Sequence, residues 1–284
     1  MTENIQIGFN IHPRWAAGST LETFLAPLKA AGLSALEFAL EGHDPDWKAF
    51  EPLMDEGASQ GYHLCFHAPF RAPYTLAGFK GNDRDAIIAL YRPMLAIAQS
   101  WAMRQGGQAT VVLHSAHSDH AERAALYADT LSFLEWALQE FDHLRIAVEN
   151  LGPSSGADVK VGDTREEVLS LVTSLDHPRL GICWDFGHDC LHHRTHLPPE
   201  EWLRRVVHVH AHDLDAAGLD HYPLVFGNCP YRAWLQAVAC SGMRGVATLE
   251  VKGGQMKGWS LERVTKALVD SIKDLKEAST CLTQ

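Results

Sequence analysis

The chain has 284 residues and a net charge of −11 at pH 7, with 46% hydrophobic and 21% charged residues. This composition is typical of a globular protein with a full apolar core, and the length suits one large barrel or two ordinary domains. The 35 acidic residues outnumber the 24 basic ones. This balance argues against nucleic acid as a partner, because nucleic-acid binders present a basic face.

Neither the first residues of the chain nor the cysteine pattern indicates a secreted protein. No basic segment followed by an apolar run is present at the start, so we expect no signal peptide. No stretch approaches the roughly 18 apolar residues of a membrane span. The six cysteines include no CxxC pair, so we expect no disulfide and no structural zinc. These features together predict a cytoplasmic protein.

Short apolar runs alternate with longer amphipathic stretches along the whole chain, which predicts alternating strands and helices. The first helix is expected to begin after Ser19 or Thr20 and to end at Gly32. The predicted strands cover residues 5–11, 35–41, 63–68, 109–115, 145–150, 180–185, 207–213 and 246–251. The predicted helices cover residues 20–31, 46–60, 83–104, 121–141, 164–175, a short stretch from about 198, 231–240 and 261–278.

Eight strand–helix units without an intervening linker predict an α/β fold, a single (β/α)8 TIM barrel over residues 1–284. The strands are short and mostly apolar, as in a parallel sheet buried on both faces. A doubly wound open sheet is the alternative. No GxGxxG follows the first strand and no Walker loop is present, so the barrel is favoured.

In such barrels the active site lies at the carboxyl ends of the strands. Six consecutive predicted strands, or the loops after them, carry His, Asp or Glu at that end: His67, His114, His117, Glu149, Asp185, His188, His210, Asp213, Asp220, His221 and Glu250. These residue types bind divalent ions such as Zn²⁺, Mn²⁺ and Mg²⁺. Carboxylates that face one another in a dry pocket would repel without a cation. We therefore predict a divalent-metal site; the alternative is that each residue is structural.

The predicted strand 207–213 carries three histidines on one face, because side chains alternate along a strand. Within the barrel, His210 is level with Asp185 and Glu250 and is the expected metal ligand. His208 lies one step deeper and is expected to be a hydrogen-bonded core residue. His212 is expected at the mouth, where it could contact substrate.

The motifs His-Ala-Pro, Leu-His-x-x-His, Val-Glu-Asn, Trp-Asp-Phe-Gly-His, His-Ala-His-Asp, Asp-His and Leu-Glu occur in this order along the strands. This order resembles the xylose isomerase-like TIM-barrel superfamily, which includes sugar and sugar-phosphate isomerases and epimerases, and endonuclease IV. The resemblance runs from about Ile5 to the last helix.

The isomerase and epimerase branch of this superfamily implies one Mn²⁺-like ion held by Glu149, Asp185, His210 and Glu250, all of which are present. The position of His188 binds substrate in that branch. The two glutamates would move a proton at the carbon next to a carbonyl, and the ion would stabilise the enediolate.

The endonuclease IV branch implies three zinc ions instead. Its ligand positions match His67, His114, Glu149, Asp185, His188, His210, His221 and Glu250. A ninth position, an aspartate, is Leu219 here, although Asp220 is adjacent. This departure puts the third ion, and with it a phosphodiester mechanism, in doubt.

We therefore expect a metal-dependent isomerase or epimerase of a sugar, sugar phosphate or related polyol, with Mn or Zn as cofactor and Mg, Fe or Co as further candidates. The partners would be a small-molecule substrate and, in a possible homo-oligomer, further copies of the chain. The alternatives are a multinuclear phosphoester hydrolase of small molecules and a barrel that binds metal without catalysis.

Several other residues are weaker candidates. Substrate contacts are possible for His117, His212, Asp213 and Lys252. The residues His12, Arg14, Glu37, Glu41 and His43 could line the pocket, but such residues are more often surface or cap groups. A solvated loop, or a substrate lid, is expected around His192, His193 and His196, and Trp184 is expected to pack outward against a helix.

Overall fold

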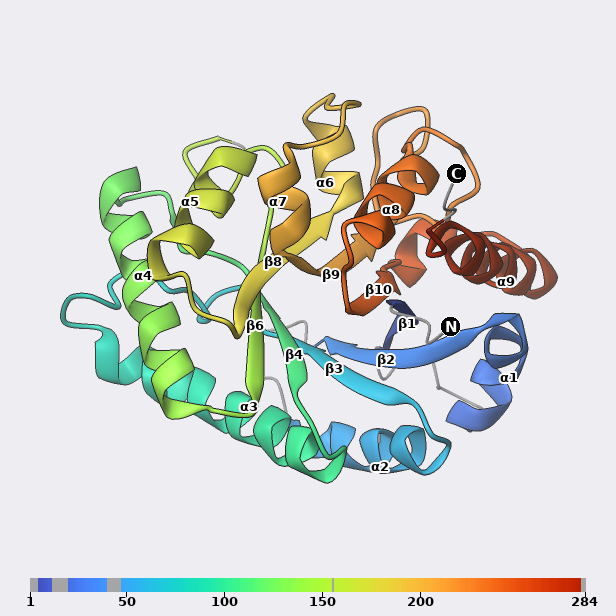
Figure 1. Cartoon of the computed structure of the whole chain (residues 1–284), viewed down its shortest axis with the longest axis horizontal. Coiled ribbons are helices and arrows are strands. Elements are labelled where there is room, and N and C mark those ends of the chain that lie inside the picture. The colour runs from blue at the N-terminus through green and yellow to red at the C-terminus, as the bar shows by residue number, and fades with distance from the viewer. Residues whose placement is uncertain (1–4, 12–19, 40–46, 155, 282–284) are drawn as a thin grey trace.

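The structure is a computed structural model that describes residues 5–11, 20–39, 47–154 and 156–281. Of the candidates above, His12, Arg14, Glu41 and His43 lie outside the described residues. Figure 1 shows strands gathered in the centre of the molecule with helices around them.

The strands form a closed barrel in the order β1-β10-β9-β8-β6-β4-β3-β2, and every neighbouring pair is parallel. This confirms the predicted (β/α)8 TIM barrel. The barrel strands are β1 (Ile5–Ile11), β2 (Leu33–Ala39), β3 (His63–His67), β4 (Ala109–Leu113), β6 (Leu144–Glu149), β8 (Leu180–Asp185), β9 (Val206–Ala211) and β10 (Gly245–Leu249).

The outer layer is made of helices that follow the strands, as Figure 1 shows. They are α1 (Leu21–Ala31), α2 (Glu51–Ser59, after the 3₁₀ turn η2, Trp47–Phe50), α3 (Arg84–Arg104), α4 (Arg123–Glu140), α5 (Arg165–Leu175), α6 (Phe186–Leu191), α7 (Glu200–Arg205), α8 (Tyr231–Cys240) and α9 (Leu261–Ala278). Another 3₁₀ turn, η3 (Gly253–Met256), precedes α9. Helix α9 packs against both α8 and α1 and so closes the ring.

Local sequence signals set the helix ends. The Thr20 side chain accepts a hydrogen bond from the Thr23 amide at the start of α1, and Gly32 ends the helix with a φ of 115°. Glycine adopts this left-handed conformation at little cost, because it has no Cβ atom. Thr164 and Ser260 cap α5 and α9 in the same way as Thr20.

Strand residues divide between the helix-facing core and the barrel interior. The interior side includes a cluster of small residues, Val112, Ala147 and Cys183, that is separate from the main core. Because side chains alternate along a strand, Ala147 and Cys183 lie below Glu149 and Asp185, on the same face of their strands.

The Gly/Ser-rich stretch 152–162 contains a short strand that the sequence did not indicate. In it β7 (Val159–Lys160) pairs antiparallel with β5 (His117–Ser118), and His117 lies opposite Lys160. This ribbon places two polar residues from distant parts of the chain beside each other at the edge of the barrel.

The prediction that no disulfide forms is wrong. Cys240, at the end of α8, is bonded to Cys281, which follows α9. The two cysteines are 41 residues apart in sequence and meet because α8 and α9 pack side by side. Spacing along the chain could not show this, and the cysteine pattern no longer supports a cytoplasmic location.

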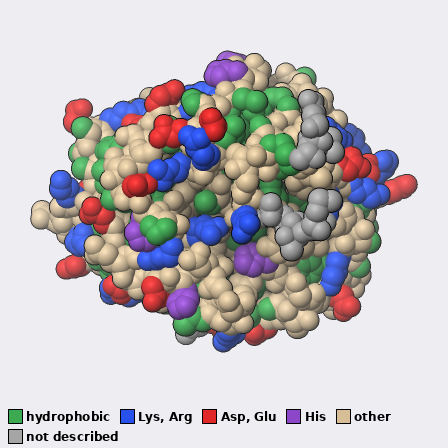
Figure 2. All heavy atoms as spheres, in the orientation of Figure 1, with side chains coloured by type: hydrophobic (Ala, Val, Ile, Leu, Met, Phe, Trp, Pro, Cys, Tyr) green, Lys and Arg blue, Asp and Glu red, His purple; other side chains and the backbone are tan. Residues whose placement is uncertain are grey.

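The surface carries both signs of charge. In the face shown in Figure 2, Lys and Arg side chains lie near the middle and acidic side chains lie mainly toward the edges. Among the helices that the structure describes, none combines the length and the apolar character needed to span a bilayer.

Candidate active site

Four side chains converge at the carboxyl ends of β6, β8, β9 and β10. The Nδ1 atom of His210 lies 3.3 Å from Glu250 Oε2, 3.5 Å from Glu149 Oε1 and 3.9 Å from Asp185 Oδ2. Each of the four strands contributes one residue, so the barrel itself sets the geometry. These are the four residues predicted as a metal site.

The arrangement fits a divalent cation. Around an ion with ligand distances of about 2.1 Å, neighbouring ligand atoms lie about 3.0–3.5 Å apart. His210 Nδ1 and Glu250 Oε2 are buried and have no hydrogen-bond partner among the described residues. Three carboxylates and an unpartnered imidazole nitrogen in a buried space are costly unless a positive charge lies between them.

Asp185 is held by several contacts at the junction of β8 and α6. Its Oδ1 accepts a hydrogen bond from the His188 amide at 2.7 Å, so it is also the N-cap of α6. The side chain of Asn150 accepts from the Asp185 amide at 2.7 Å and donates to its carbonyl at 2.9 Å. The Val-Glu-Asn motif thereby ties the ends of β6 and β8 together.

His188 faces the same group of carboxylates. Its Nδ1 donates to the carbonyl of Asn150 at 2.9 Å and lies 3.3 Å from both Glu149 Oε1 and Asp185 Oδ2. Burial lowers the pKa of His188, but Asp185 and Glu149 outweigh burial and raise the pKa to about 10. Because Nδ1 is engaged by the fold, Nε2 is the ring nitrogen left for the pocket.

His67 and His114 flank the other oxygen of Glu149. Their Nε2 atoms lie 3.1 and 3.0 Å from Glu149 Oε2, and His67 Nδ1 donates to the carbonyl of Ala68 at 2.8 Å. Burial lowers the pKa of His114 to about 4, although Glu149 acts in the opposite direction. The rings of Phe70 and His114 stack with centroids 4.0 Å apart. The two histidines and Glu149 could together hold a second ion.

His221, from the loop after β9, approaches Glu250. Its Nε2 is 3.5 Å from Glu250 Oε2, and its Nδ1 is 3.0 Å from Asp220 Oδ1 and 3.2 Å from Lys252 Nζ. Burial lowers the pKa of His221, but Glu250 and Asp220 raise it to about 9. Leu219 is 47% exposed, so the residue at the missing aspartate position does not join the buried ligand group, whereas the half-buried Asp220 contacts His221.

His212 is not at the mouth of the pocket, so that expectation is wrong. It is fully buried, its Nε2 lies 3.1 Å from Asp185 Oδ1, and its ring stacks on His221 at 4.1 Å. Its Nδ1 accepts a hydrogen bond from the His221 amide at 3.0 Å. Gly187 makes room for the ring, because a Cβ there would lie 1.8 Å from His212 Cε1. His212 therefore supports Asp185 and His221 from behind.

The structure gives Asp213 no access to substrate. Its carboxylate is fully buried and accepts hydrogen bonds from the amides of four consecutive residues, 226–229, at 2.7–3.2 Å, as well as from Leu214. The expected substrate contact is therefore wrong, because every oxygen is engaged in holding the loop that follows β9.

Glu37 is a weak candidate in the sequence, where its position suggests a surface or cap group. In the structure it is fully buried inside the barrel. Its carboxylate accepts hydrogen bonds from His208 Nε2 at 2.7 Å and His210 Nε2 at 3.0 Å. His208 is the buried, hydrogen-bonded core residue that was predicted. The only local signal at Glu37 is a charged residue within an apolar strand.

A pocket of about 540 Å³ opens above this group of side chains. Its floor includes Glu149, Glu250 and His188, and its wall is partly apolar: Phe70, Leu151, Pro153 and Leu191. Three cationic side chains, Arg71, Lys160 and Lys252, also line it. The predicted candidates His117 and Lys252 thus lie at the pocket, although His117 Nε2 is engaged by the Phe70 carbonyl at 3.0 Å.

The remaining predictions concern packing. Trp184 is buried and stacks on Trp234 of α8 at 5.2 Å, as expected for a side chain that packs outward. The stretch 189–196 is helical at its start, where α6 ends, and His192 is half-buried with Nε2 donating to the Leu151 carbonyl. His193 and His196 follow the helix and are exposed.

A family model described as "Xylose isomerase-like TIM barrel" matches residues 25–275. Among curated proteins, an uncharacterised protein of Methanocaldococcus jannaschii is 29% identical over 116 residues, which span 38% of this chain and 37% of that protein. The match therefore covers little more than a third of that relative's length.

Solved structures of similar fold cover nearly the whole chain. A D-tagatose 3-epimerase-like protein aligns over 96% of this chain and 97% of its own, with 21% identity and a TM-score of 0.70. D-psicose 3-epimerase from Clostridium cellulolyticum H10, solved with D-tagatose, covers 98% and 100% with 13% identity and a TM-score of 0.70. The IolI protein with a bound zinc atom covers 98% and 100% with 17% identity and a TM-score of 0.65. At these identities the likeness shows the fold.

Proposed function

The chain belongs to the xylose isomerase-like TIM-barrel family, and from that premise we propose that it is a divalent-metal-dependent isomerase or epimerase of a small sugar. The observation that carries the proposal is the convergence of His210 Nδ1 with the carboxylates of Glu149, Asp185 and Glu250. A mixed nitrogen and oxygen set of this kind suits Mn²⁺ or Zn²⁺. The ketose epimerases of similar fold agree with this activity.

The ion, when bound, would polarise the carbonyl of the substrate and so acidify the neighbouring carbon. Glu149 and Glu250 project from β6 and β10, which are separated in the barrel by β8 and β9, so their carboxylates reach the substrate from different sides. One glutamate, as the carboxylate, would remove the proton from the acidified carbon, and the other, as the carboxylic acid, would deliver its proton to the opposite face, so that the two exchange protonation states in each turnover. His188 Nε2 can accept a hydrogen bond from a substrate hydroxyl when the ring is neutral, because the ring proton is on Nδ1, which donates to the Asn150 carbonyl.

The mouth of the pocket favours a substrate with an anionic end. Among the described residues, no carboxylate lies within ion-pair distance of Arg71, Lys160 or Lys252; the Nζ atoms of the two lysines instead contact the Pro153 carbonyl and His221 Nδ1. A phosphate or carboxylate at the far end of a ketose would pair with these cations. We therefore include phosphorylated and acidic sugars in the proposed substrate class.

The test is exchange of substrate hydrogen with D₂O, followed by NMR, over a panel of free and phosphorylated ketoses with Mn²⁺ or Zn²⁺ at saturation. Glu149→Gln and Glu250→Gln are each expected to slow exchange by about 10²–10⁴-fold, the usual contribution of general acid–base catalysis. Asp185→Asn is the matched control. It removes a proposed ligand but no proton carrier, so it should weaken metal binding and keep exchange at saturating metal.

Undiminished exchange in both glutamine variants would rule out their role in proton transfer. The failure of every ketose to exchange in the metal-loaded wild-type protein would favour a barrel that binds metal without this chemistry.

A second candidate function, phosphoester hydrolysis, is favoured by one observation. His67 and His114 both contact Glu149 Oε2, and a one-ion epimerase does not need this pair. They could hold a second ion beside the first. Two or three bound ions together with phosphatase or phosphodiesterase activity on small substrates, and no ketose exchange, would support this candidate over the first.

A further inference from the structure

We propose that Glu37 is a positioning residue that fixes the ring of His210, and the tautomer in which its Nδ1 can bind the metal ion. The role of that ion rests on the function proposed above, but the hydrogen-bonding role of Glu37 does not depend on it. The proposal rests on geometry inside the barrel, below the carboxylates that face the pocket.

Glu37 reaches His210 across the barrel interior. It lies on β2, whereas His208 and His210 lie on β9, and β1 and β10 separate these strands in the barrel. All three side chains are fully buried. The contact therefore links two strands that share no backbone hydrogen bonds. It is made by side chains alone, so the buried carboxylate is explained by its hydrogen-bond partners and not by strand pairing.

A carboxylate has only acceptor atoms, so it determines the direction of each hydrogen bond. Glu37 Oε1 accepts from His210 Nε2 at 3.0 Å. The proton of the neutral imidazole must then be on Nε2, which leaves the lone pair on Nδ1. That atom faces Glu149, Asp185 and Glu250 and has no hydrogen-bond partner among the described residues. The second ring nitrogen of a metal-binding histidine is commonly held in this way.

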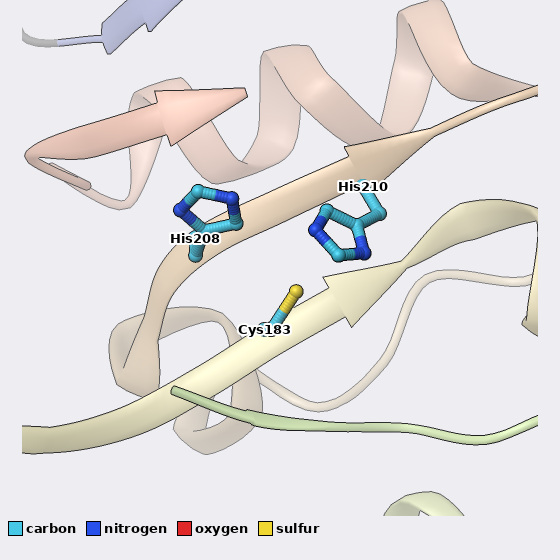
Figure 3. A group of neighbouring side chains, drawn as sticks. All are labelled: Cys183, His208 and His210. Atoms are coloured by element: carbon cyan, nitrogen blue, oxygen red, sulfur yellow. The ribbon is translucent and has the colours of Figure 1, made fainter. Parts of the chain in front are cut away.

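Two strong donors and one weak donor, the Cys65 thiol at 3.9 Å from Oε2, also hold the carboxylate. His208 Nε2 donates to Glu37 Oε2 at 2.7 Å, and Thr248 Oγ1 donates to the same oxygen at 2.9 Å. Figure 3 shows the rings of His208 and His210 projecting from the same side of β9, with the Cys183 thiol from β8 beside them. Glu37 is thus fixed from β9 and β10, and it in turn fixes the ring that faces the pocket.

The same buried side chains could instead be the ligands of a deeper metal ion, because Cys183, His208 and His210, or Glu37, Cys65 and His208, lie near one another. Two observations favour the hydrogen-bond network. The 2.7 Å contact between Glu37 and His208 is a normal hydrogen bond and is shorter than the spacing of about 3.0–3.5 Å between metal ligands. The Nε2 atoms of both histidines are already engaged by the carboxylate.

The direct test reads the tautomer of His210 in the metal-free wild-type protein, at a pH alkaline enough for the ring to be neutral. In the protein labelled with ¹⁵N-histidine, long-range ¹H–¹⁵N spectra separate a protonated ring nitrogen from one with a lone pair, and His210→Gln assigns the signals. We expect Nε2 of His210 to carry a proton in a hydrogen bond that is lost in Glu37→Gln. A His210 ring whose Nε2 carries no proton in the wild-type protein would overturn the proposal.

Metal affinity is the second readout, measured by competition with a chelator using Mn²⁺ and Zn²⁺. Glu37→Gln should bind about 10–100-fold more weakly than wild type, the usual cost of losing such a partner, and Glu37→Asp should fall between them. Cys65→Ala is the matched control, since it removes a buried neighbour of Glu37 and no donor to the metal site, and it should bind as wild type does. A folded Glu37→Gln variant with wild-type affinity would contradict a positioning role.

The outcomes separate the two proposals. A wild-type protein that binds no ion but has the expected His210 tautomer would contradict the metal-dependent function and would still support the role of Glu37. A cobalt-loaded wild-type protein with a thiolate-to-cobalt absorption band that is lost in Cys65→Ala or Cys183→Ala would instead place an ion in the deeper cluster, and would overturn the hydrogen-bond role.

Discussion

In several histidines of the site, one ring nitrogen serves the fold and the other faces the carboxylates or the pocket. His67 and His188 use Nδ1 to donate to backbone carbonyls, whereas His210 uses Nε2 to donate to Glu37. The orientation of each ring therefore depends on groups below or beside the site, so the geometry exists before substrate arrives. Preorganisation of this kind lowers the cost of binding an ion or a transition state.

Metal-free protein should lose stability as the solution becomes alkaline. The pKa values of His188 and His221 are raised to about 10 and about 9, against an ordinary 6.5, because the carboxylates around them outweigh burial. A raised pKa means that the folded state holds the proton more tightly than the unfolded state. Its stabilising effect is therefore complete below about pH 6.5 and is lost as the pH rises through about 9 to 10.

The measurement is the melting temperature of chelator-treated and metal-loaded protein from about pH 7 to about pH 10. The metal-free protein should lose its stability over this range more steeply than the metal-loaded protein, in which an ion replaces these protons. Identical pH profiles for the two forms would contradict the idea that protons and the ion share one site.

For single residues, the sequence predicts the four that converge in the site but not the side chains that hold them in place. His210, Glu149, Asp185 and Glu250 each lie at or beside the carboxyl end of a strand and belong to short motifs. Glu37 contacts His210 across 173 positions of sequence, so no local pattern can reveal the pair. Asp213 and His212 belong to a motif that indicates function, yet they act on the loop and on neighbouring side chains.

Among the elements, the β5–β7 ribbon contributes residues from two distant segments to the pocket. It brings His117 opposite Lys160, and both residues line the cavity together with Lys252. Neither short strand is visible as an apolar or alternating run, because each has only two residues. The long barrel strands, by contrast, are predictable from their apolar runs, and their ends lie within two residues of the predicted ones.

These cations should matter for anionic substrates only. Lys160→Met and Lys252→Met are each expected to raise the KM of a phosphorylated ketose by about 5- to 20-fold, with less effect on kcat, because they would act on the end of the substrate away from the reacting carbon. A neutral ketose should show little change, and added salt should reduce the difference.

Steady-state kinetics with matched neutral and phosphorylated ketoses provide this comparison. Lys266→Met is the control, since Lys266 is exposed on α9 and pairs with Asp270. Equal effects of Lys160→Met on both substrates would count against an anion-binding mouth.

At the scale of the whole molecule, the disulfide links the end of α8 to the segment that follows α9. Cys240 and Cys281 bracket β10 and α9, so the bond restricts the unfolded chain over a long loop. Cys281→Ser should lower the free energy of unfolding by about 2–4 kcal/mol under oxidising conditions. Metal affinity should not change, because the bond lies outside the group of side chains that faces the pocket.

Denaturant unfolding with and without a reductant measures this effect. Reduction of the wild-type protein should reproduce the loss seen in Cys281→Ser and should have no further effect on the variant. A variant as stable as the oxidised wild-type protein would show that the bond contributes nothing in solution.

The whole architecture is predictable because the alternation of strand and helix repeats eight times and constrains the topology. The substrate is not, because the pocket wall comes from loop segments such as 70–72, 151–153 and 158–160, in which spatial neighbours are far apart in sequence. The periodic pattern of apolar residues predicts the barrel. The contacts that determine substrate specificity depend instead on how the loops pack against one another.

The link from Glu37 to His210 also has an evolutionary consequence. A lineage that replaced His210 by an apolar residue would leave a buried carboxylate with one fewer donor, and one that replaced Glu37 would leave both histidines without their acceptor. Each single substitution is costly, so the two positions, with His208, should be inherited or lost as a unit. Homologues that keep Glu37 are therefore expected to keep the metal-facing histidine, even where the residues around the mouth have diverged.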